Sequence, residues 1–560
     1  MEPDELHALL ASGEQLDVEF KSDHHKPFND SSIVEAVVCM ANGGGGRLLI
    51  GVEDDGTVTG ARARHGRMTD PTRLRTMVAN NTVPQVVPDV EVASQQGKSI
   101  IIVEVAAADT VVGTCNGLYV RRGYGSDGRP ACLPFLAHEM LADRISRGQV
   151  DFAAIPEPEA SIHDLDPKEF ERFRNLAAAA GGQADVFAGL ADDELLSALG
   201  VAERRGGELL LRRGALLLFG QEEALRRLVP THETAFQVLE RGVVVQNEIS
   251  SSPLLRSAER LYSLLQAMNS QEEVMVGLIR MGIDRIPEVT ARELVANALV
   301  HRDYTRMGVV SVQVVDDELT ITSPGGFPLG VTLGNILESS NPRSRILAEA
   351  FKRAGIVDRA GRGINRVFEA SLRAGRPEPD YTRSTSERVS VSVQLGGTDS
   401  DLVRFVVEHD DRAGRRFDLA DLQVVRALKE DPRLSAADIA DVIQRPLVWT
   451  KSRLAMLLEE GLVEMRGDGR GRRYTLSAAS YRRLASAAGY VRVRAFDVLQ
   501  QRQMILNFVE ANGSISRSEA ADLSGATPEA ARRMLLRMRE EGALVLRGER
   551  RAARYYLPAN

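Results

Sequence analysis

A repeat within the C-terminal part of the chain limits its fold more than any other feature of the sequence. Residues 434–442 (LSAADIADV) match residues 515–523 (ISRSEAADL) at an offset of 81 residues. At the same offset, residues 459–461 (EEG) recur as residues 540–542. Such a constant offset over a stretch of this length indicates two copies of one small structural module.

The order of elements within each copy predicts a winged helix-turn-helix. A short helix, a turn and a longer helix ending at Glu-Gly are followed by two strands, which are joined by a tip rich in Arg and Gly. A helix of this kind fits the major groove of DNA, and a hairpin with Arg at its tip reaches the phosphate backbone. We therefore predict winged helices over 415–478 and 499–560, with a linker helix over 479–498.

The charge of the second copy favours contact with nucleic acid. The whole chain has a formal net charge of -8, whereas residues 481–560 hold 14 Arg against 8 acidic residues. A local positive excess of this kind is typical of phosphate contact. Because the first copy is balanced in charge, contact with protein is the alternative for it. The residues that we expect to touch nucleic acid are Lys451, Arg453, Arg532, Arg533, Arg547, Arg550, Arg551 and Arg554.

The composition excludes several other classes of protein. The 560 residues leave room for about three to five domains. The three cysteines lie far apart without a C-x-x-C motif, so we expect no disulfide framework, no cysteine zinc site and a reducing, cytoplasmic setting. We see no signal peptide, and no apolar run approaches the ~20 residues that a membrane helix needs.

Four short motifs follow one another in the N-terminal part. They are Glu14-x4-Glu19-Phe20-Lys21, Ala41-Asn42-Gly43-Gly44, Gly51-Val52-Glu53-Asp54-Asp55-Gly56 and Tyr119-Val120-Arg121-Arg122-Gly123. The pattern around them predicts alternating short helices and strands in an α+β domain. In this order the motifs resemble the Schlafen/AlbA-type domain.

That resemblance implies association with nucleic acid. In nuclease members of the family, three acidic residues on neighbouring strands bind a divalent metal ion and cut RNA. The matching residues here are Glu14, Glu19 and one of Asp54 or Asp55, which suit Mg²⁺ or Mn²⁺, and Lys21 would neutralise phosphate. The alternative is binding without catalysis, in which Asp54-Asp55-Gly56 is an ordinary turn.

A carboxylate and a carboxamide share one helix face in the central part, because Glu293 and Asn297 are four residues apart. Three further motifs follow, namely His301-Arg302-Asp303-Tyr304, Ser323-Pro324-Gly325-Gly326-Phe327 and Gly361-Arg362-Gly363-Ile364. The set resembles the divergent ATPase domain that occurs next to Schlafen/AlbA-type domains. This domain is related to histidine kinases, the gyrase B subunit and one class of heat-shock chaperones.

The second resemblance implies roles for these residues. Glu293 would orient water, and Asn297 would bind the Mg²⁺ that the phosphates of ATP hold. Four glycines would let the backbone approach the nucleotide, namely Gly325, Gly326, Gly361 and Gly363. The sequence departs from the family in having Ser323 where an Asp usually reads adenine.

Two alternatives bear on the central part. Thr290-x-x-Glu293 fits a capping box, which would give Glu293 a structural role instead. A helicase of the P-loop type is excluded, because Gly97-Lys98-Ser99 is preceded by Val92 where a P-loop needs glycine.

We therefore predict an α+β multidomain chain. A Schlafen/AlbA-type domain spans 1–152, a connecting α/β module 153–287 and a central α/β sandwich of the GHKL ATPase type 288–397. The two winged helices follow.

The expected function is that of a cytoplasmic, nucleic-acid-binding transcriptional regulator. Its partners would be DNA rather than RNA and a second copy of the chain, with no membrane, and its cofactor would be ATP with Mg²⁺. One alternative is a Schlafen-type nuclease that uses Mg²⁺ or Mn²⁺ to cut tRNA, other RNA or DNA in stress or phage defence. Another is an ATP-binding scaffold that oligomerises through its winged helices. A nuclease needs Glu14, Glu19 and Asp54 or Asp55 around one metal position, whereas separated acids favour a binding protein.

Overall fold

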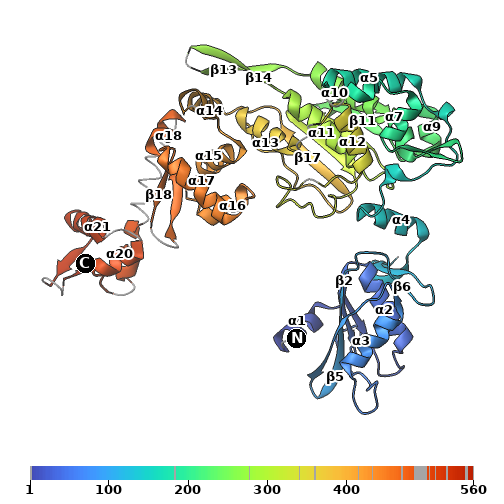
Figure 1. Ribbon diagram of the computed structural model, residues 1–560. Coiled ribbons are helices and arrows are strands. Elements are labelled where there is room, and N and C mark those ends of the chain that lie inside the picture. The colour runs from blue at the N-terminus through green and yellow to red at the C-terminus, as the bar shows by residue number, and fades with distance from the viewer. Residues whose placement is uncertain are drawn as a thin grey trace. The chain divides into compact units, whose positions relative to one another are not determined.

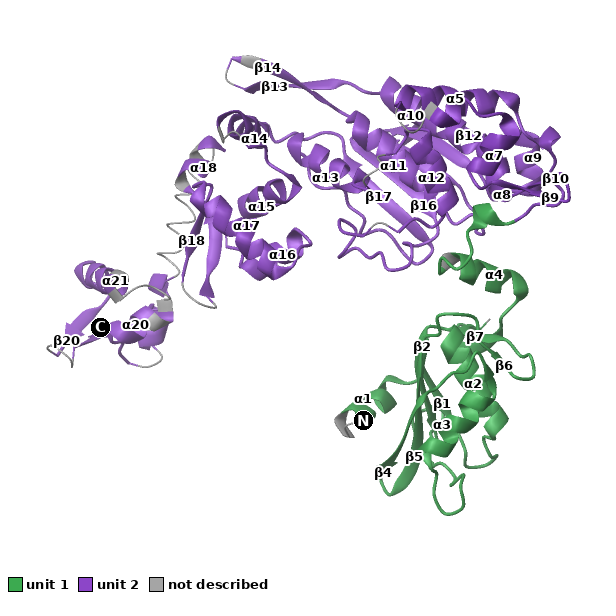
Figure 2. Ribbon diagram, in the orientation of Figure 1, with its two compact units in different colours: residues 1–155 green, residues 156–560 purple. Residues whose placement is uncertain are grey.

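The structure is a computed structural model that divides into two compact units, residues 1–155 and 156–560 (Figure 2). The described residues are 3–125, 127–181, 185–276, 278–339, 341–357, 361–413, 415–431, 433–467, 471–484, 501–503, 505–510, 513–524, 528–548 and 553–558.

Unit 1 is built on a four-stranded sheet in the order β1-β2-β5-β4 (Figure 1). Strand β1 runs parallel to β2, and the other neighbours are antiparallel. The apolar side chains of α2 and α3 share a core with one face of the sheet, and Leu6 of α1 packs with the other face. The elements are α1 (Pro3–Ser12), β1 (Val18–Lys21), α2 (Asp30–Asn42), β2 (Gly45–Ile50), α3 (Pro71–Asn80), β3 (Thr82–Val83), β4 (Asp89–Gln95), β5 (Lys98–Ala106), β6 (Gly113–Thr114), β7 (Val120–Tyr124), β8 (Pro130–Pro134) and α4 (Ala137–Ser146).

The expectation that no disulfide forms is wrong. Cys39 on α2 and Cys132 on β8 form a disulfide, with their Cα atoms 5.8 Å apart. The two cysteines are 93 positions apart in the sequence, and the chain between them folds so that β7 and its partner β8 lie against α2. Sequence separation alone could not reveal this approach, and Cys115 is the free, exposed cysteine.

Unit 2 contains a five-stranded sheet in the order β12-β11-β15-β16-β17. One face carries alternating apolar residues such as Val310, Val312 and Val314, against which α11 packs. The other face carries hydroxyl side chains, and Thr320 bonds Ser392 across the strands. This is the helix-covered sheet of a two-layer α/β sandwich.

The predicted boundary at residue 287 does not separate two sheets. Strands β11 and β12 lie in the predicted connecting module, yet β11 pairs in parallel with β15 of the predicted ATPase domain. The elements of this part are α5 (Pro167–Ala180), α6 (Asp185–Ala188), α7 (Asp192–Ala198), β9 (Ala202–Arg205), β10 (Glu208–Leu211), α8 (Arg213–Phe219), α9 (Glu222–Leu228), β11 (Thr234–Glu240), β12 (Val243–Ser250), α10 (Leu254–Ala267), β13 (Gln271–Val276), β14 (Ile279–Asp284), α11 (Glu288–Val300), β15 (Val310–Val315), β16 (Glu318–Pro324), α12 (Arg345–Arg353), α13 (Gly363–Arg373) and β17 (Arg388–Gln394), with short 3-10 turns at Phe152–Ala154 and Ile162–Asp164.

The two C-terminal modules repeat the same elements. Helices α16 (Ala436–Val442) and α17 (Leu447–Glu459) recur 81 residues later as α20 (Arg517–Ser524) and α21 (Pro528–Glu540). Each module then closes with a hairpin and has an apolar core, which in the first module also takes in Leu372 of α13. The predicted linker helix begins within α18, and its residues 485–498 lie outside the described residues. The remaining elements are α14 (Ser400–Ala413), α15 (Leu419–Glu430), β18 (Val463–Arg466), β19 (Arg473–Leu476), α18 (Ala478–Arg483), β20 (Val545–Arg547) and β21 (Arg554–Tyr556). In the described part of the chain, no helix is long and apolar enough to cross a membrane.

A buried histidine makes the stability of unit 2 depend on pH. His232 is 2% exposed, its Nε2 lies 2.7 Å from the carbonyl oxygen of Ser252, and burial lowers its pKa from 6.5 to about 4. Below pH 6.5 His232 is mostly protonated in the unfolded chain but stays neutral in the folded chain until about pH 4. The free energy of unfolding therefore falls as pH falls. We expect a loss of about 2 kcal/mol between pH 7 and pH 5 from this group.

The measurement is urea unfolding of the full chain at several pH values. His232→Gln should reduce the loss of stability between pH 7 and pH 5 by about 2 kcal/mol, whereas the same change at the exposed His163 should leave the loss as in the wild type. An equally steep dependence in His232→Gln would contradict this assignment.

Candidate functional site

The first N-terminal motif forms a network of charges. Glu19 on β1 is 4% exposed, and its carboxylate lies 2.8 Å from Lys21 Nζ and 3.2 Å from Arg122 Nη1. Lys21 Nζ also lies 3.8 Å from Glu14, whose carboxylate accepts a hydrogen bond from the backbone N–H of Phe20. The structure thus brings together Glu14, Glu19 and Lys21, and adds Arg122, which the sequence motif contains but to which no role was given.

The Ala-Asn-Gly-Gly motif positions that arginine. The Asn42 side chain donates to the carbonyl oxygens of Val112 and Val120 and accepts from the N–H of Val112. A Cβ atom at Gly43 would lie 2.4 Å from the Cβ of Arg122, so only glycine lets the chain with Arg122 pass this close. The motif is therefore explained by packing around the Glu19–Arg122 pair.

The third predicted acid lies elsewhere. Asp54 and Asp55 are exposed in the turn that follows β2, and Asp55 accepts a hydrogen bond from the N–H of Thr57. Glu53 instead faces Ser22 and Thr59, and their hydrogen bonds lower its pKa. Across the described residues, no group of three Asp, Glu, His or Cys side chains is placed to hold a metal ion. Among the described residues, Asp54 and Asp55 therefore do not complete a metal site with Glu14 and Glu19.

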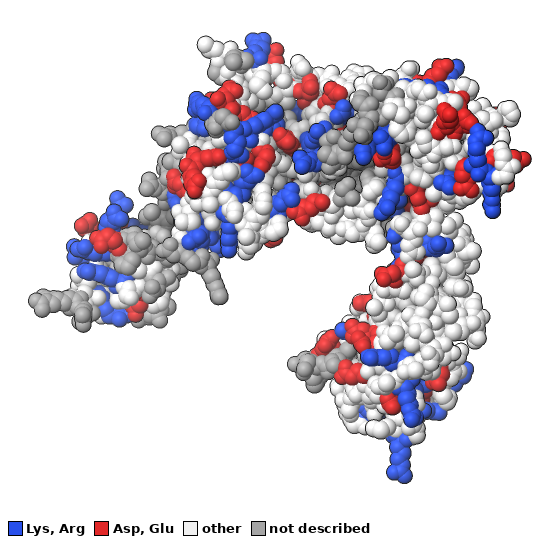
Figure 3. Space-filling view, in the orientation of Figure 1, with Lys and Arg blue, Asp and Glu red and all other residues white. Residues whose placement is uncertain are grey.

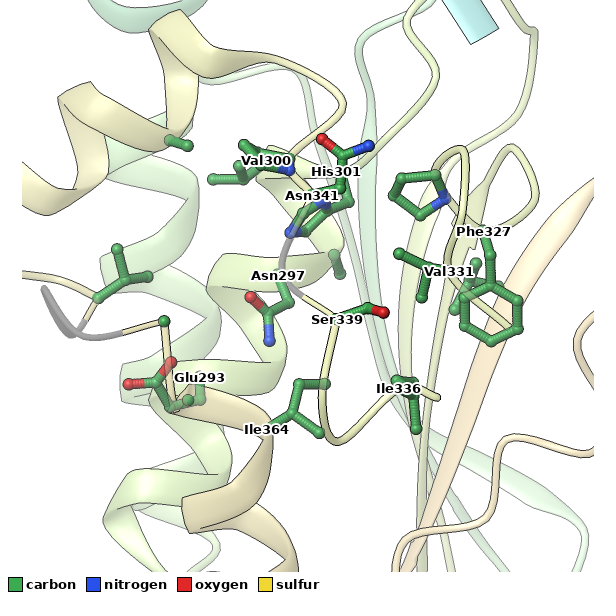
Figure 4. A pocket seen from close by; sticks show the side chains of 18 of the residues that line it. Glu293, Asn297, Val300, His301, Phe327, Val331, Ile336, Ser339, Asn341 and Ile364 are labelled. Carbon is green, nitrogen blue, oxygen red and sulfur yellow. The ribbon is translucent and has the colours of Figure 1, made fainter. Parts of the chain in front are cut away.

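The central motifs surround a pocket of about 550 Å³ in unit 2. Its lining comes from α11, β16, the segment 327–339, α12, the start of α13, Tyr381 and β17. Figure 4 shows Glu293 and Asn297 on one side of the cavity, with Phe327, Val331 and Ile336 on the opposite side. The volume lies within the range of small-molecule sites, roughly 300–1,000 Å³.

The polar end of the pocket is set by helix α11. Glu293 and Asn297 lie one turn apart on the same face and both line the cavity. The capping box predicted for Glu293 does not form, because the helix begins at Glu288 with Pro287 as its N-cap, which places Thr290 inside the helix. The carboxylate of Glu293 instead lies against Gly363, where a Cβ atom would be 2.1 Å from Oε2.

The glycine turns differ in what they do. Gly325, Gly361 and Gly363 line the pocket, whereas Gly326 is not among its lining residues. Gly325 has a φ of 96° and leaves no room for a Cβ beside Asp303. Ser323, which stands where the family has an adenine-reading Asp, donates its hydroxyl to the carbonyl oxygen of Ala298 and is 6% exposed.

His301 is a pocket residue that was not predicted from the sequence. His301 extends the face of Glu293 and Asn297 by one more turn and lines the pocket. Burial and the neighbouring Arg343 lower the pKa of His301 to about 4, so its ring is neutral at pH 7. Its Nδ1 is buried with no hydrogen-bond partner among the described residues. The signal was available in the sequence, because His301 follows Asn297 by four residues.

The rest of the His301-Arg302-Asp303-Tyr304 motif is structural. Arg302 is 1% exposed, and its guanidinium donates to the carbonyl oxygens of Thr231 and Gly308, among others. Tyr304 donates its hydroxyl to the carbonyl oxygen of Leu299. These bonds join the loop after α11 to the loop before β11, which holds the end of α11 in place.

The predicted nucleic-acid contacts differ between the modules. In the first, Arg453 pairs with Asp418 and packs over the ring of Trp449. In the second, Arg533 is exposed, and Figure 3 shows Lys and Arg gathered over this module. Lys451, on α17 of the first module, is exposed. In the second module Arg532 lies 3.5 Å from Glu529, Arg547 stacks over Tyr556 and Arg554 pairs with Glu519. Arg550 and Arg551 lie outside the described residues.

Three family models match separate parts of the chain. Residues 14–128 match "Schlafen, AlbA_2", residues 308–393 match "Putative ATP-dependent DNA helicase recG C-terminal" and residues 138–235 match a domain of unknown function, DUF8451. The chain contains a Schlafen/AlbA_2 domain and a RecG C-terminal-type domain. These domains mark it as a nucleic-acid-related protein.

Two solved structures are similar to the chain. The DIP2311 protein from Corynebacterium diphtheriae is 21% identical, with 99% of each chain covered and a TM-score of 0.48. The N-terminal domain of a RecG-related protein from Nitrosomonas europaea is 24% identical, with 22% of this chain and 89% of that chain covered and a TM-score of 0.16. No curated protein matches the chain.

The charge network of the Schlafen/AlbA_2 domain gives a stability prediction. Glu19→Gln keeps the size of the side chain but leaves the buried Arg122 guanidinium without its carboxylate, which should destabilise the domain by about 3 kcal/mol. The matched control is Glu5→Gln, which breaks the more exposed pair between Glu5 and Arg47 and should cost less than about 1 kcal/mol.

Thermal melting of both variants, with and without Mn²⁺, checks this expectation. A metal site would behave in the opposite way, because removing one of several clustered carboxylates relieves repulsion in the absence of metal. A wild type that is stabilised by Mn²⁺, together with a Glu19→Gln variant as stable as the wild type without metal, would contradict the structural role.

Proposed function

We propose that the protein is a DNA-binding regulator whose RecG C-terminal-type domain binds ATP with Mg²⁺. The observation that carries the proposal is the division of the pocket. One end presents a carboxylate and a carboxamide, and the other is lined by aromatic and aliphatic side chains. A nucleotide has the same division, with charged phosphates at one end and a flat apolar base at the other.

The residues present fit such a ligand. The side-chain oxygens of Glu293 and Asn297 are the kind of donors that Mg²⁺ takes, and Mg²⁺ would neutralise the charge of the phosphates there. The backbone at Gly361 and Gly363 begins helix α13 beside them, and the first N–H groups of a helix bind phosphate. At the far end Phe327 and Tyr381 would pack on the base, with their ring centroids 6.2 Å apart.

The adenine would have to be read differently from the family pattern. Ser323 is already bonded to a backbone carbonyl, so it has little to offer a base. The buried Nδ1 of the neutral His301 is a free hydrogen-bonding group on the pocket wall. We therefore assign base recognition to the apolar wall and nucleotide orientation to His301.

Calorimetric titration of the full chain with ATP and Mg²⁺ tests nucleotide binding. We expect the wild type to bind, and Asn297→Ala to lose at least about tenfold in Mg²⁺-dependent affinity, because an oxygen donor to the metal is removed. Asn247→Ala, on strand β12 and outside the pocket lining, is the control and should bind as the wild type does. No heat of binding in the wild type would make the domain a scaffold without nucleotide.

The regulator part of the proposal rests on the second C-terminal module. Arg532 and Arg533 lie on α21, the helix that a winged helix would place in the major groove. Replacing both with Ala should weaken binding to duplex DNA and lower the slope of log affinity against log salt by about two.

The control for DNA binding is the double change Arg204→Ala with Arg205→Ala. These exposed arginines lie on β9, at a distance in sequence from either module. DNA affinity and salt slope are measured by fluorescence anisotropy from low to high salt. An unaltered slope in the Arg532 and Arg533 variant would remove α21 from the interface.

A further inference from the structure

The pocket is in contact with the first C-terminal module through the wall segment, defined as residues 327–339. Gln444, in the turn between α16 and α17, donates from Nε2 to the carbonyl oxygen of Leu333 at 2.9 Å. Its Oε1 accepts from the N–H of Leu337 at 3.4 Å. Beside it, Arg445 Nη1 lies 2.7 Å from the Glu338 carboxylate. Leu337 and Glu338 both line the pocket.

Gln444 and Arg445 supply the polar contacts that hold the wall segment from outside, whereas its apolar side chains pack inward, as Phe327 does against Tyr381. In the described part of the chain, its other side-chain hydrogen bonds are local: Thr332 and Gly330 bond to Asn335, and Leu329 bonds to Asn341. Without Gln444 and Arg445 the segment would keep its own turns and the apolar packing of Phe327, Ile336 and Leu337. Its opening would then cost less free energy, because the polar contacts that oppose it are lost.

The same module also supports the opposite wall. Leu372 of α13 belongs to the apolar core that contains Phe417 and Leu422 of the module and Phe405 of α14. Helix α13 begins at Gly363, in the lining of the pocket. The module is therefore fixed to one wall by a shared core and reaches the other wall by the polar contacts of Gln444 and Arg445.

The backbone at Gln444 supports a specific role for this contact. Gln444 has a φ of 51°, a left-handed conformation that side chains other than glycine rarely adopt. Glycine would be the favoured residue in such a turn. The chain has a glutamine there instead, and both the nitrogen and the oxygen of its carboxamide form hydrogen bonds with the wall segment.

We propose that Gln444 and Arg445 are positioning residues of the nucleotide pocket, which hold the wall segment in place so that nucleotide affinity depends on the first C-terminal module. This inference rests on the proposed nucleotide binding. Because coupling between two sites is reciprocal, a bound nucleotide also holds the α16–α17 turn against the wall segment. That turn leads into the helix end that would enter a DNA groove, so nucleotide in the pocket opposes DNA binding at this module.

The first variant tests the contribution of the Gln444 side chain apart from that of its backbone conformation. Gln444→Gly removes both hydrogen bonds but favours the left-handed turn, so folding is retained. The matched control is Arg241→Gly, which makes the same change at another positive φ, 51°, in the turn between β11 and β12. We expect Gln444→Gly to weaken Mg²⁺-ATP binding about fivefold, as the loss of partly exposed hydrogen bonds implies, and Arg241→Gly to leave it unchanged.

Hydrogen exchange of the nucleotide-free protein gives a second readout that needs no ligand. The amides of the wall segment, Leu337 above all, should exchange several-fold faster in Gln444→Gly, with the melting temperature retained. Arg445→Glu should act in the same direction, and Arg445→Glu combined with Glu338→Arg should restore slow exchange, because the ion pair is rebuilt with its charges reversed.

The outcomes distinguish the two proposals. If the wild type binds no nucleotide, the proposed function fails, while the exchange experiment still decides whether Gln444 and Arg445 hold the wall. If the wild type binds nucleotide and Gln444→Gly changes neither affinity nor exchange relative to Arg241→Gly, the positioning role is overturned.

Discussion

The pocket of unit 2 depends on how helix α11 is buried. The helix packs on the five-stranded sheet, with α10, α12 and α13 around it, and most of its side chains are buried. A helix in this position has few places for polar groups, because burying a polar side chain without a partner is costly. The carboxylate of Glu293 and the carboxamide of Asn297 are therefore confined to the one face that opens to the cavity, and the close approach of Gly363 keeps that face accessible beside α13.

A different arrangement of charge governs the Schlafen/AlbA_2 domain. There Glu19 and Arg122 are both buried, and Lys21 adds a second cation to the same carboxylate. Charges that leave water must be paired and hydrogen-bonded, and the chain supplies these partners itself. The acidic residues of the first motif are thus bonded within the domain, whereas the polar residues of the central pocket face a cavity. This contrast supports the proposal that the ligand binds in unit 2.

Much of the local structure could be predicted from the sequence. The order of elements in each C-terminal copy predicted the hairpins of β18 with β19 and of β20 with β21, and the 81-residue repeat predicted α20 and α21 from α16 and α17. The face shared by Glu293 and Asn297 followed from helical spacing alone, and both residues line the pocket. Local periodicity was sufficient in these cases, because each feature lies within one helix, one hairpin or one repeat.

Features that depend on distant pairing could not be predicted in this way. Strand β11 pairs with β15 although some seventy residues separate them, so the boundary drawn at 287 cut through one sheet. The Cys39–Cys132 disulfide depends on β8 lying against α2. The alternative of a capping box at Thr290 was wrong, because Pro287 is the N-cap and the helix already begins at Glu288. The Thr-x-x-Glu pattern had suggested a later start of the helix. His301 was missed as a pocket residue because its motif was taken as a unit, whereas only its first residue faces the cavity.

The proposed nucleotide lies in this pocket with its base on the apolar wall. Photolabelling of the full chain with an azido-adenine analogue of ATP, followed by peptide mapping, would locate the base. We expect the label to fall on peptides containing Phe327 to Ile336 or Tyr381, and excess ATP with Mg²⁺ to remove it. Label confined to unit 1 or to the C-terminal modules, or label that excess ATP leaves in place, would contradict the account.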